Sequence, residues 1–177
     1  MTAALLVIDV QQGLCEGDEV PLAHHEIIDR INDVAGKART ARVPVIFIQH
    51  ESADDYLPYG SARWHLADGL TALDSDLRVR KTTPDSFFGT TLEATLKEHG
   101  VTHLVICGMH TEYCVDTTTR RALALGYPVR LIADGHTTVS NAALSAGQII
   151  HHHNLTLTGI SSFGPRVRAV PAADITF

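Results

Sequence analysis

The sequence is poor in cysteine and in aromatic residues. Its 177 residues include three cysteines, one tryptophan and 6% aromatic residues in total. The cysteines, Cys15, Cys107 and Cys114, are odd in number and form no C-x-x-C pair. Neither a disulfide framework nor a zinc ribbon is therefore indicated, and we expect free thiols.

The sequence also lacks a long apolar run and an excess of basic residues. The first apolar run, residues 3–8, is interrupted by Asp9 and is too short for a signal peptide or a membrane span. Lys and Arg number 14 against 20 Asp and Glu, which gives a net charge of −6, and the basic residues are scattered. We expect a cytoplasmic protein that binds neither nucleic acid nor a membrane.

A dinucleotide-binding fingerprint is missing too. The first apolar run continues into Asp9-Val10-Gln11-Gln12-Gly13, where a G-x-G-x-x-G loop would be required. This absence argues against a nicotinamide or flavin dinucleotide cofactor.

What the sequence does contain is a regular alternation of apolar runs and helical patterns. With 45% hydrophobic residues, residues 1–177 suit a single globular domain. The alternation predicts an α/β fold, a three-layer αβα sandwich of Rossmann-like type around a mostly parallel sheet of about six strands. The predicted strands are Ala4–Asp9, Val43–Gln49, Arg78–Lys81, His103–Gly108, Val129–Asp134 and Leu155–Gly159.

Helical spacing connects these runs. It predicts helices around residues 27–38, over 92–99, after Val115 and over 142–153. The longest irregular piece, residues 51–76, is longer than a plain connection needs and is a candidate lid over a substrate. Residues 167–177 are either a loosely held tail or an oligomer contact.

Reactive side chains stand at the ends of three predicted strands. Asp9 ends the first strand, Lys81 ends the third, and Cys114 follows the fourth, in what reads as the first turn of a helix. Ligands of open parallel sheets bind at the carboxyl ends of the strands, so these residues can share one cleft. There a carboxylate can take the thiol proton, an ammonium can balance the charges, and helix N–H groups favour the thiolate and hold an oxyanion. Acyl transfer is the reaction that this set favours.

Each residue also has a simpler explanation. Asp9 can cap a turn, Lys81 can be a solvated charge, and Cys114 can be a small core residue. The three together favour a site more strongly than any one of them alone.

Three ordered motifs carry a resemblance to a known family. They are Leu6-Val7-Ile8-Asp9-Val10-Gln11, then Lys81 ahead of Asp85-Ser86-Phe87, then Gly108-Met109-His110-Thr111-Glu112-Tyr113-Cys114-Val115. The pattern resembles the isochorismatase-like cysteine hydrolases over nearly the whole chain. That family includes nicotinamidases and ureido and streptothricin hydrolases, most of which cleave a C–N bond of a small amide.

The resemblance assigns roles to the residues in these motifs. It implies that Cys114 is the nucleophile, Asp9 the general base and Lys81 the charge partner. It also implies a cis peptide between Met109 and His110, with the His110 and Cys114 N–H groups forming an oxyanion hole. Through the relatives it further implies a homo-oligomer, a dimer or a tetramer.

The sequence departs from the metal-binding nicotinamidases. Residues 49–55 read QHESADD and lack the family's Asp-x-His metal motif, so we predict no metal and no other cofactor. Gln49-His50-Glu51 and Gly60-Ser61 followed by Trp64 instead resemble the streptothricin hydrolase-like branch. The residues expected to contact the small-molecule substrate are Gln12, His50, Trp64, Phe87 and Tyr113.

Three functions are compatible with these observations. The first is a cysteine hydrolase that cleaves an amide, ureide or lactam. The second is an isochorismatase-type ether hydrolase, against which the presence of Cys114 argues, and the third is a non-catalytic binding subunit with the same fold. His136, after the fifth predicted strand, either shapes the site or belongs to a hydrogen-bonded turn, and we assign it no catalytic role.

Overall fold

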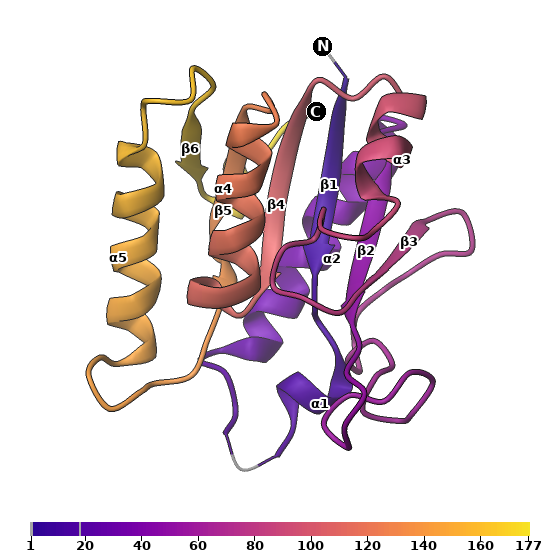
Figure 1. The fold of residues 1–177 in the computed structure, drawn as a ribbon, viewed down its shortest axis with the longest axis vertical. Coiled ribbons are helices and arrows are strands. Elements are labelled where there is room, and N and C mark those ends of the chain that lie inside the picture. Colours follow the sequence, from indigo (N-terminus) through magenta and orange to yellow (C-terminus); the bar gives the residue numbers. More distant parts are fainter. Residues whose placement is uncertain (1, 18) are drawn as a thin grey trace.

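The fold follows a regular succession of strands and helices (Figure 1). A computed structural model describes residues 2–17 and 19–177. In chain order the elements are β1 (Ala3–Ile8), α1 (Gln12–Cys15), α2 (His24–Thr40), β2 (Val45–His50), β3 (Leu77–Lys81), α3 (Leu92–Glu98), β4 (His103–Met109), the π-helical turn Thr111–Val115, α4 (Asp116–Ala124), β5 (Val129–Thr137), α5 (Ala146–Gly159), β6 (Val167–Val170) and the 3-10 turn Ala172–Asp174.

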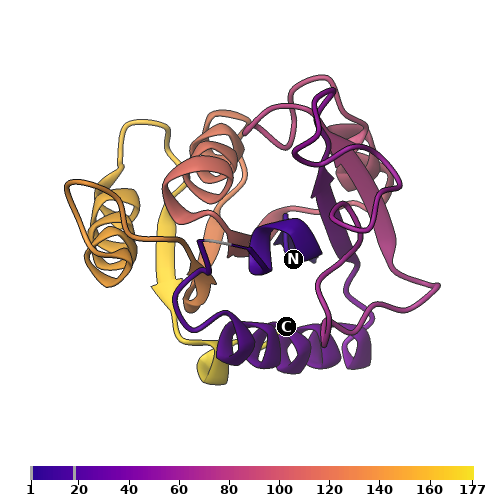
Figure 2. The same cartoon turned by 90° about the horizontal axis from the view of Figure 1, so that it is seen from below.

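The strands form one sheet between two helical layers. The sheet has six strands in the order β3-β2-β1-β4-β5-β6, and all five pairings between neighbouring strands are parallel. Helix α2 covers one face, and α3, α4 and α5 cover the other, as the view from below shows (Figure 2). The predicted α/β fold with a parallel sheet of about six strands is confirmed.

Both faces of the sheet are apolar because both are covered. Along β1, Leu5 and Val7 pack with Ile31 of α2, whereas Leu6 and Ile8 belong to the second core. This second core includes the apolar residues of α3 and α4. The strand therefore reads as a continuous apolar run rather than as an alternation of apolar and polar residues.

One predicted strand was wrong. Residues Leu155–Gly159 are the last part of α5, and the sixth strand is Val167–Val170, in the segment that we expected to be a tail or an oligomer contact. The alternating Leu and Thr of 155–158 imitate the two-residue period of a strand. The helix nevertheless continues, because Ser145 and Gln148 form a capping box at its start and Leu157 is buried against the core.

Strands β1 and β4 lie so close together at Gly108 that a side chain there would not fit. The φ of Gly108 is +120°, and a Cβ atom there would lie 2.0 Å from the Ile8 carbonyl oxygen. The next residue after Ile8 is Asp9, whose φ of 53° turns the chain away from the sheet. Gly108 therefore permits the contact that brings the end of β1 to the end of β4.

No helix in the described residues, 2–17 and 19–177, is long and apolar enough to cross a membrane.

Replacing Gly108 tests this close approach. We expect Gly108→Ala to lower the free energy of unfolding by at least about 3 kcal/mol, because the new methyl group meets backbone and the φ value is unfavourable. Gly36→Ala is the matched control, since Gly36 lies on α2 with nothing within 4 Å of an added Cβ atom. It should raise that free energy by about 0.5 to 1 kcal/mol, measured by urea denaturation. Similar values for the two variants would contradict the packing described.

Candidate active site

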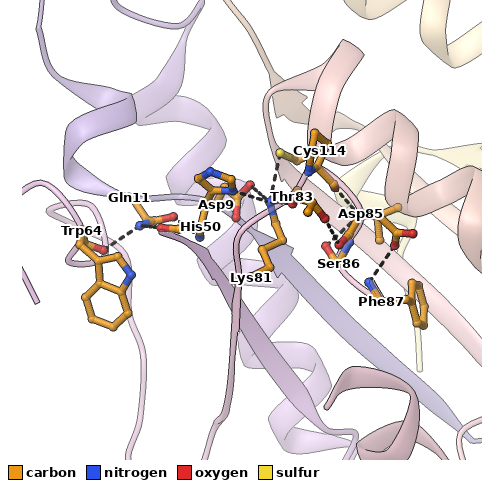
Figure 3. Close-up of polar contacts among 12 residues, drawn as sticks. Asp9, Gln11, His50, Trp64, Lys81, Thr83, Asp85, Ser86, Phe87 and Cys114 are labelled. Carbon is orange, nitrogen blue, oxygen red and sulfur yellow. Dashed lines mark hydrogen bonds and ion pairs between the residues drawn. The ribbon is translucent and has the colours of Figure 1, made fainter. Parts of the chain in front are cut away.

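The ends of three strands bring a carboxylate, an ammonium and a thiol together (Figure 3). Lys81 Nζ lies 2.6 Å from Asp9 Oδ2 and 3.1 Å from Cys114 Sγ. The side chains of Lys81 and Asp9 are 0% and 1% exposed, so this ion pair is shielded from water. Residues from β1, β3 and the turn after β4 thus meet at one point at the carboxyl edge of the sheet.

Lys81 is held by the alternation of β3 and by several acceptors. Val79 and Lys81 face inward, while Arg78 and Arg80 face solvent. The ammonium also donates to the Thr83 carbonyl at 3.1 Å. Burial alone would lower the pKa of Lys81, but the charge of Asp9 and the hydrogen bonds raise it above its ordinary value, so the ammonium stays charged.

Asp9 has one oxygen free for chemistry. Oδ2 faces Lys81, whereas Oδ1 is buried and has no hydrogen-bond partner among the described residues. The Asp9 N–H donates to the Ile48 carbonyl at 2.8 Å, which fixes the backbone where β1 ends. A buried carboxylate oxygen without a donor is a ready acceptor for a proton.

Cys114 lies in a different setting from the one expected. It belongs to the π-helical turn Thr111–Val115, and α4 begins only at Asp116. Burial and then the negative charge of Asp9 raise the pKa of the Cys114 thiol to about 12, while Lys81 lowers it. These influences oppose the stabilisation of a thiolate that a helix start offers.

His110 lies between the end of β4 and the π-helical turn. The peptide bond between Met109 and His110 is cis. The His110 carbonyl accepts from the N–H groups of Tyr113 and Val115, each at 3.2 Å. No acceptor for the His110 N–H itself is found among residues 2–17 and 19–177. Burial lowers the pKa of the His110 imidazole, which keeps it neutral at neutral pH.

A cavity of about 250 Å³ opens on the thiol. Its lining is Asp9, Leu14, His50, Tyr56, Leu57, Pro84, His110, Tyr113 and Cys114. A second cavity of about 260 Å³ shares Leu14, Tyr56 and His110 with the first and is also lined by Glu16, Glu19 and Arg63. Of the residues expected to contact a substrate, His50 and Tyr113 therefore line the cavity at the thiol.

Three other expected substrate contacts lie elsewhere. Gln12 turns toward residues 51–76, where its Oε1 atom accepts from the Asp68 N–H at 2.9 Å. Trp64 lines a separate cavity of about 530 Å³ on the β2–β3 side of the sheet. Phe87 is 6% exposed and stacks on Tyr127, with 6.3 Å between ring centroids, in the core beneath α3 and α4. None of the three lines the cavity at Cys114.

Gln11 supports the site, although it was not among the residues predicted from the sequence to react or to bind substrate. Its buried side chain donates to the His50 carbonyl at 2.9 Å and accepts from the His50 N–H at 2.7 Å. It also donates to the Trp64 carbonyl at 2.9 Å. The signal available in the sequence was a glutamine two residues after Asp9, at the end of an otherwise apolar strand.

A hydrogen-bonded contact between Ser86 and Thr118 also supports the site. Their hydroxyl groups are 2.7 Å apart, and the Ser86 N–H donates to Thr118 Oγ1 at 3.2 Å. Thr118 lies on α4, one helical turn after Cys114, so this contact ties the loop after Lys81 to the helix that follows the thiol. Both side chains are fully buried.

No group of three or more His, Cys, Asp or Glu side chains among residues 2–17 and 19–177 is arranged to hold a metal ion.

The chain is similar to known proteins over most of its length. The isochorismatase domain matches residues 3–152. Streptothricin hydrolase from Streptomyces noursei is 37% identical over 137 residues, which cover 76% of this chain and 49% of that protein, about half its length. Ureidoacrylate amidohydrolase RutB from Variovorax paradoxus is 27% identical over 184 residues, covering 83% of this chain and 73% of that protein.

A crystal structure of an isochorismatase family protein has the same fold. It superposes with a TM-score of 0.87 at 34% sequence identity, and the match covers 95% of this chain and 97% of that one.

A double-mutant cycle measures how much the contact between Asp9 and Lys81 contributes to the free energy of unfolding. We expect Lys81→Met to lower the free energy of unfolding by about 3 to 5 kcal/mol, because it leaves a buried carboxylate without its partner. The double variant Asp9→Asn with Lys81→Met should recover at least about 2 kcal/mol relative to the sum of the two single changes.

Arg120 and Asp116 on α4 provide the matched control, as an ion pair whose arginine is 44% exposed. The same double-mutant cycle on that pair should give a coupling of about 0.5 kcal/mol or less by urea denaturation. An equally small coupling for Asp9 and Lys81 would contradict the buried pair.

Proposed function

Because the chain belongs to the isochorismatase family of hydrolases, we propose that it is a cysteine hydrolase of a small amide, ureide or lactam. In this proposal the C–N bond is cleaved through a thioester on Cys114. Asp9 is the base and acid, and Lys81 is the charge partner of both.

One observation carries the proposal. Lys81 Nζ bridges Asp9 Oδ2 at 2.6 Å and Cys114 Sγ at 3.1 Å, beside a cavity large enough for a small molecule. The unpartnered Asp9 Oδ1 supports its role as the proton acceptor. A fully buried lysine and aspartate beside a thiol have no evident structural use that apolar residues would not serve as well.

The relatives support the choice of a C–N bond. Two of them are named streptothricin hydrolase and ureidoacrylate amidohydrolase. Neither substrate is assigned to this chain, since the matched segment spans 49% of the first protein and is 27% identical to the second.

The first half of the reaction acylates the enzyme. Asp9 accepts the thiol proton as Cys114 Sγ attacks the substrate carbonyl carbon, so no free thiolate accumulates at its pKa of about 12. The carbonyl electrons move to oxygen, and the N–H groups of His110 and Cys114 stabilise that oxyanion. When the C–N bond breaks, Asp9 returns its proton to the departing nitrogen and the thioester remains.

The second half releases the acid. Asp9, again a carboxylate, takes a proton from water as the water oxygen attacks the thioester carbon. The sulfur leaves and recovers the proton from Asp9, and the carboxylic acid departs. Lys81 enters the reaction as an ammonium, because the charge of Asp9 raises its pKa above the ordinary value in the resting site.

The cavity restricts the substrate to a small molecule. A volume of about 250 Å³ fits an acyl group of modest size. Leu14, Leu57 and Pro84 offer it apolar contacts, and His50 and Tyr113 offer polar ones. Burial and then the charge of Lys81 lower the pKa of His50, so its imidazole is a neutral hydrogen-bonding group.

Turnover by defined variants tests the proposal. The protein is incubated with a panel of small primary amides, ureides and lactams, and released ammonia or ring opening is measured. Cys114→Ala should abolish turnover of any compound that is hydrolysed, and Asp9→Asn should lower kcat by about 10² to 10⁴ because the proton has no acceptor.

Cys15→Ala is the control, since Cys15 is a buried thiol that lies outside the cavity at Cys114. It should keep kcat within about twofold of the unmodified protein, as expected of a residue outside the reaction. Amide hydrolysis that persists in Cys114→Ala would rule out the thioester. A vinyl ether incubated in parallel and consumed by both proteins would favour ether hydrolysis instead.

A further inference from the structure

A chain of hydrogen bonds lies behind the turn that carries Cys114. Thr111 Oγ1 is 2.9 Å from His136 Nδ1, and His136 Nε2 is 3.1 Å from Asn154 Oδ1. Asn154 Nδ2 donates in turn to the Ala133 carbonyl at 2.9 Å. Thr111 and His136 are 0% and 1% exposed. The hydrolysis described above uses none of these side chains.

The Asn154 amide determines which atom donates and which accepts in each of these hydrogen bonds. Since Nδ2 donates to Ala133, we assign Oδ1 as the acceptor for a proton on His136 Nε2. His136 Nδ1 then carries a lone pair, which accepts the hydroxyl proton of Thr111. Burial lowers the pKa of His136 to about 4, so the imidazole is neutral at neutral pH and this arrangement persists.

These hydrogen bonds connect the π-helical turn to two neighbouring elements. His136 lies on β5, where it pairs with Gly108 of β4, and Asn154 lies on α5. Thr111 is the first residue of the π-helical turn, and its carbonyl accepts the Asp116 N–H at the start of α4. The position of Thr111 therefore sets where the turn begins and how it joins α4.

Thr111 also lies between the two N–H groups of the proposed oxyanion hole. His110 is the residue before it, and Cys114 follows three residues later. A shift of Thr111 moves both N–H groups and the sulfur relative to Asp9 and Lys81. Acyl transfer is sensitive to such shifts, since displacements of about 1 Å can cost about 10² in rate.

We propose that His136 is a positioning residue, which acts through the Thr111 hydroxyl to hold Cys114 and the two N–H groups in the geometry of acyl transfer. This inference rests on the proposed function. His136 touches no substrate, so its loss lowers kcat and leaves KM nearly unchanged. A residue with only a structural role would change stability without separating the two constants.

The hydroxyl of Thr111 is removed in Thr111→Val and retained in Thr111→Ser. We expect Thr111→Val to lower kcat about tenfold or more with KM within about twofold, and Thr111→Ser to recover most of kcat. Thr119→Val is the matched control, because Thr119 is a buried threonine of α4 whose hydroxyl has no hydrogen-bond partner among the described residues. A kcat for Thr111→Val equal to that of Thr119→Val would overturn the proposal, as would a failure of Thr111→Ser to recover.

The His136→Phe variant tests whether the two residues act together. Its kcat should fall to the level of Thr111→Val, and the double variant should fall no further, because the same hydrogen bond is lost in each. Losses that multiply in the double variant would show that His136 does not act through Thr111.

Alkylation of Cys114 by iodoacetamide separates this inference from the proposed function. It needs no substrate, so it can be measured even if no amide is hydrolysed. At neutral pH we expect the alkylation rate of Thr111→Val to differ at least about threefold from that of the unmodified protein, because its sulfur shifts relative to Asp9, whose charge raises the thiol pKa, and to Lys81, whose charge lowers it. Thr111→Ser and Thr119→Val should react at the unmodified rate. Equal rates for all four proteins would overturn the positioning role, whereas missing turnover alone would overturn only the proposed function.

Discussion

The buried contact between Lys81 and Asp9 is the constraint on which the site depends. Both side chains are almost fully shielded from water, with 2.6 Å between the charged atoms. Removing two charges from water costs several kcal/mol per ion, and only close geometry and further hydrogen bonds offset that cost. The sheet provides this geometry because β1, β2 and β3 are parallel neighbours, which brings the end of β1 and the end of β3 to the same edge. The Thr83 carbonyl adds a further acceptor for the ammonium.

The same pair accounts for the state of the thiol. A cysteine near a lysine is often a thiolate, but here burial and the charge of Asp9 outweigh the charge of Lys81 and raise the thiol pKa to about 12. The ammonium is already paired with Asp9, so it cannot fully stabilise a second negative charge. In the proposed reaction the proton therefore leaves Cys114 during attack on the substrate, and Asp9 Oδ1 is the acceptor available. Charge then moves within the site while its net charge stays the same.

The sequence predicted the layers of the fold and the meeting of Asp9, Lys81 and Cys114, because residues at the carboxyl ends of parallel strands converge whatever lies between them. It failed where local pattern and tertiary contact disagree. Leu155–Gly159 alternates like a strand but continues a helix that packs on the core. The sequence placed Cys114 in the first turn of a helix, and the structure has it in a π-helical turn that runs directly into α4. The contacts of Gln12, Trp64 and Phe87 depend on residues that are distant in the chain or on a neighbouring core, so no local rule could predict them.

The central claim is that Cys114 carries the acyl group of the substrate during turnover. Mass spectrometry of protein quenched with acid in the steady state, with any amide that the protein hydrolyses, tests it directly. We expect an added mass equal to the substrate less its amine, or to the whole substrate for a lactam, mapped by peptide digestion to Cys114 and absent from Cys15 and Cys107. Acyl groups found on another residue, or steady turnover in deacylation-limited conditions with Cys114 unmodified, would contradict it.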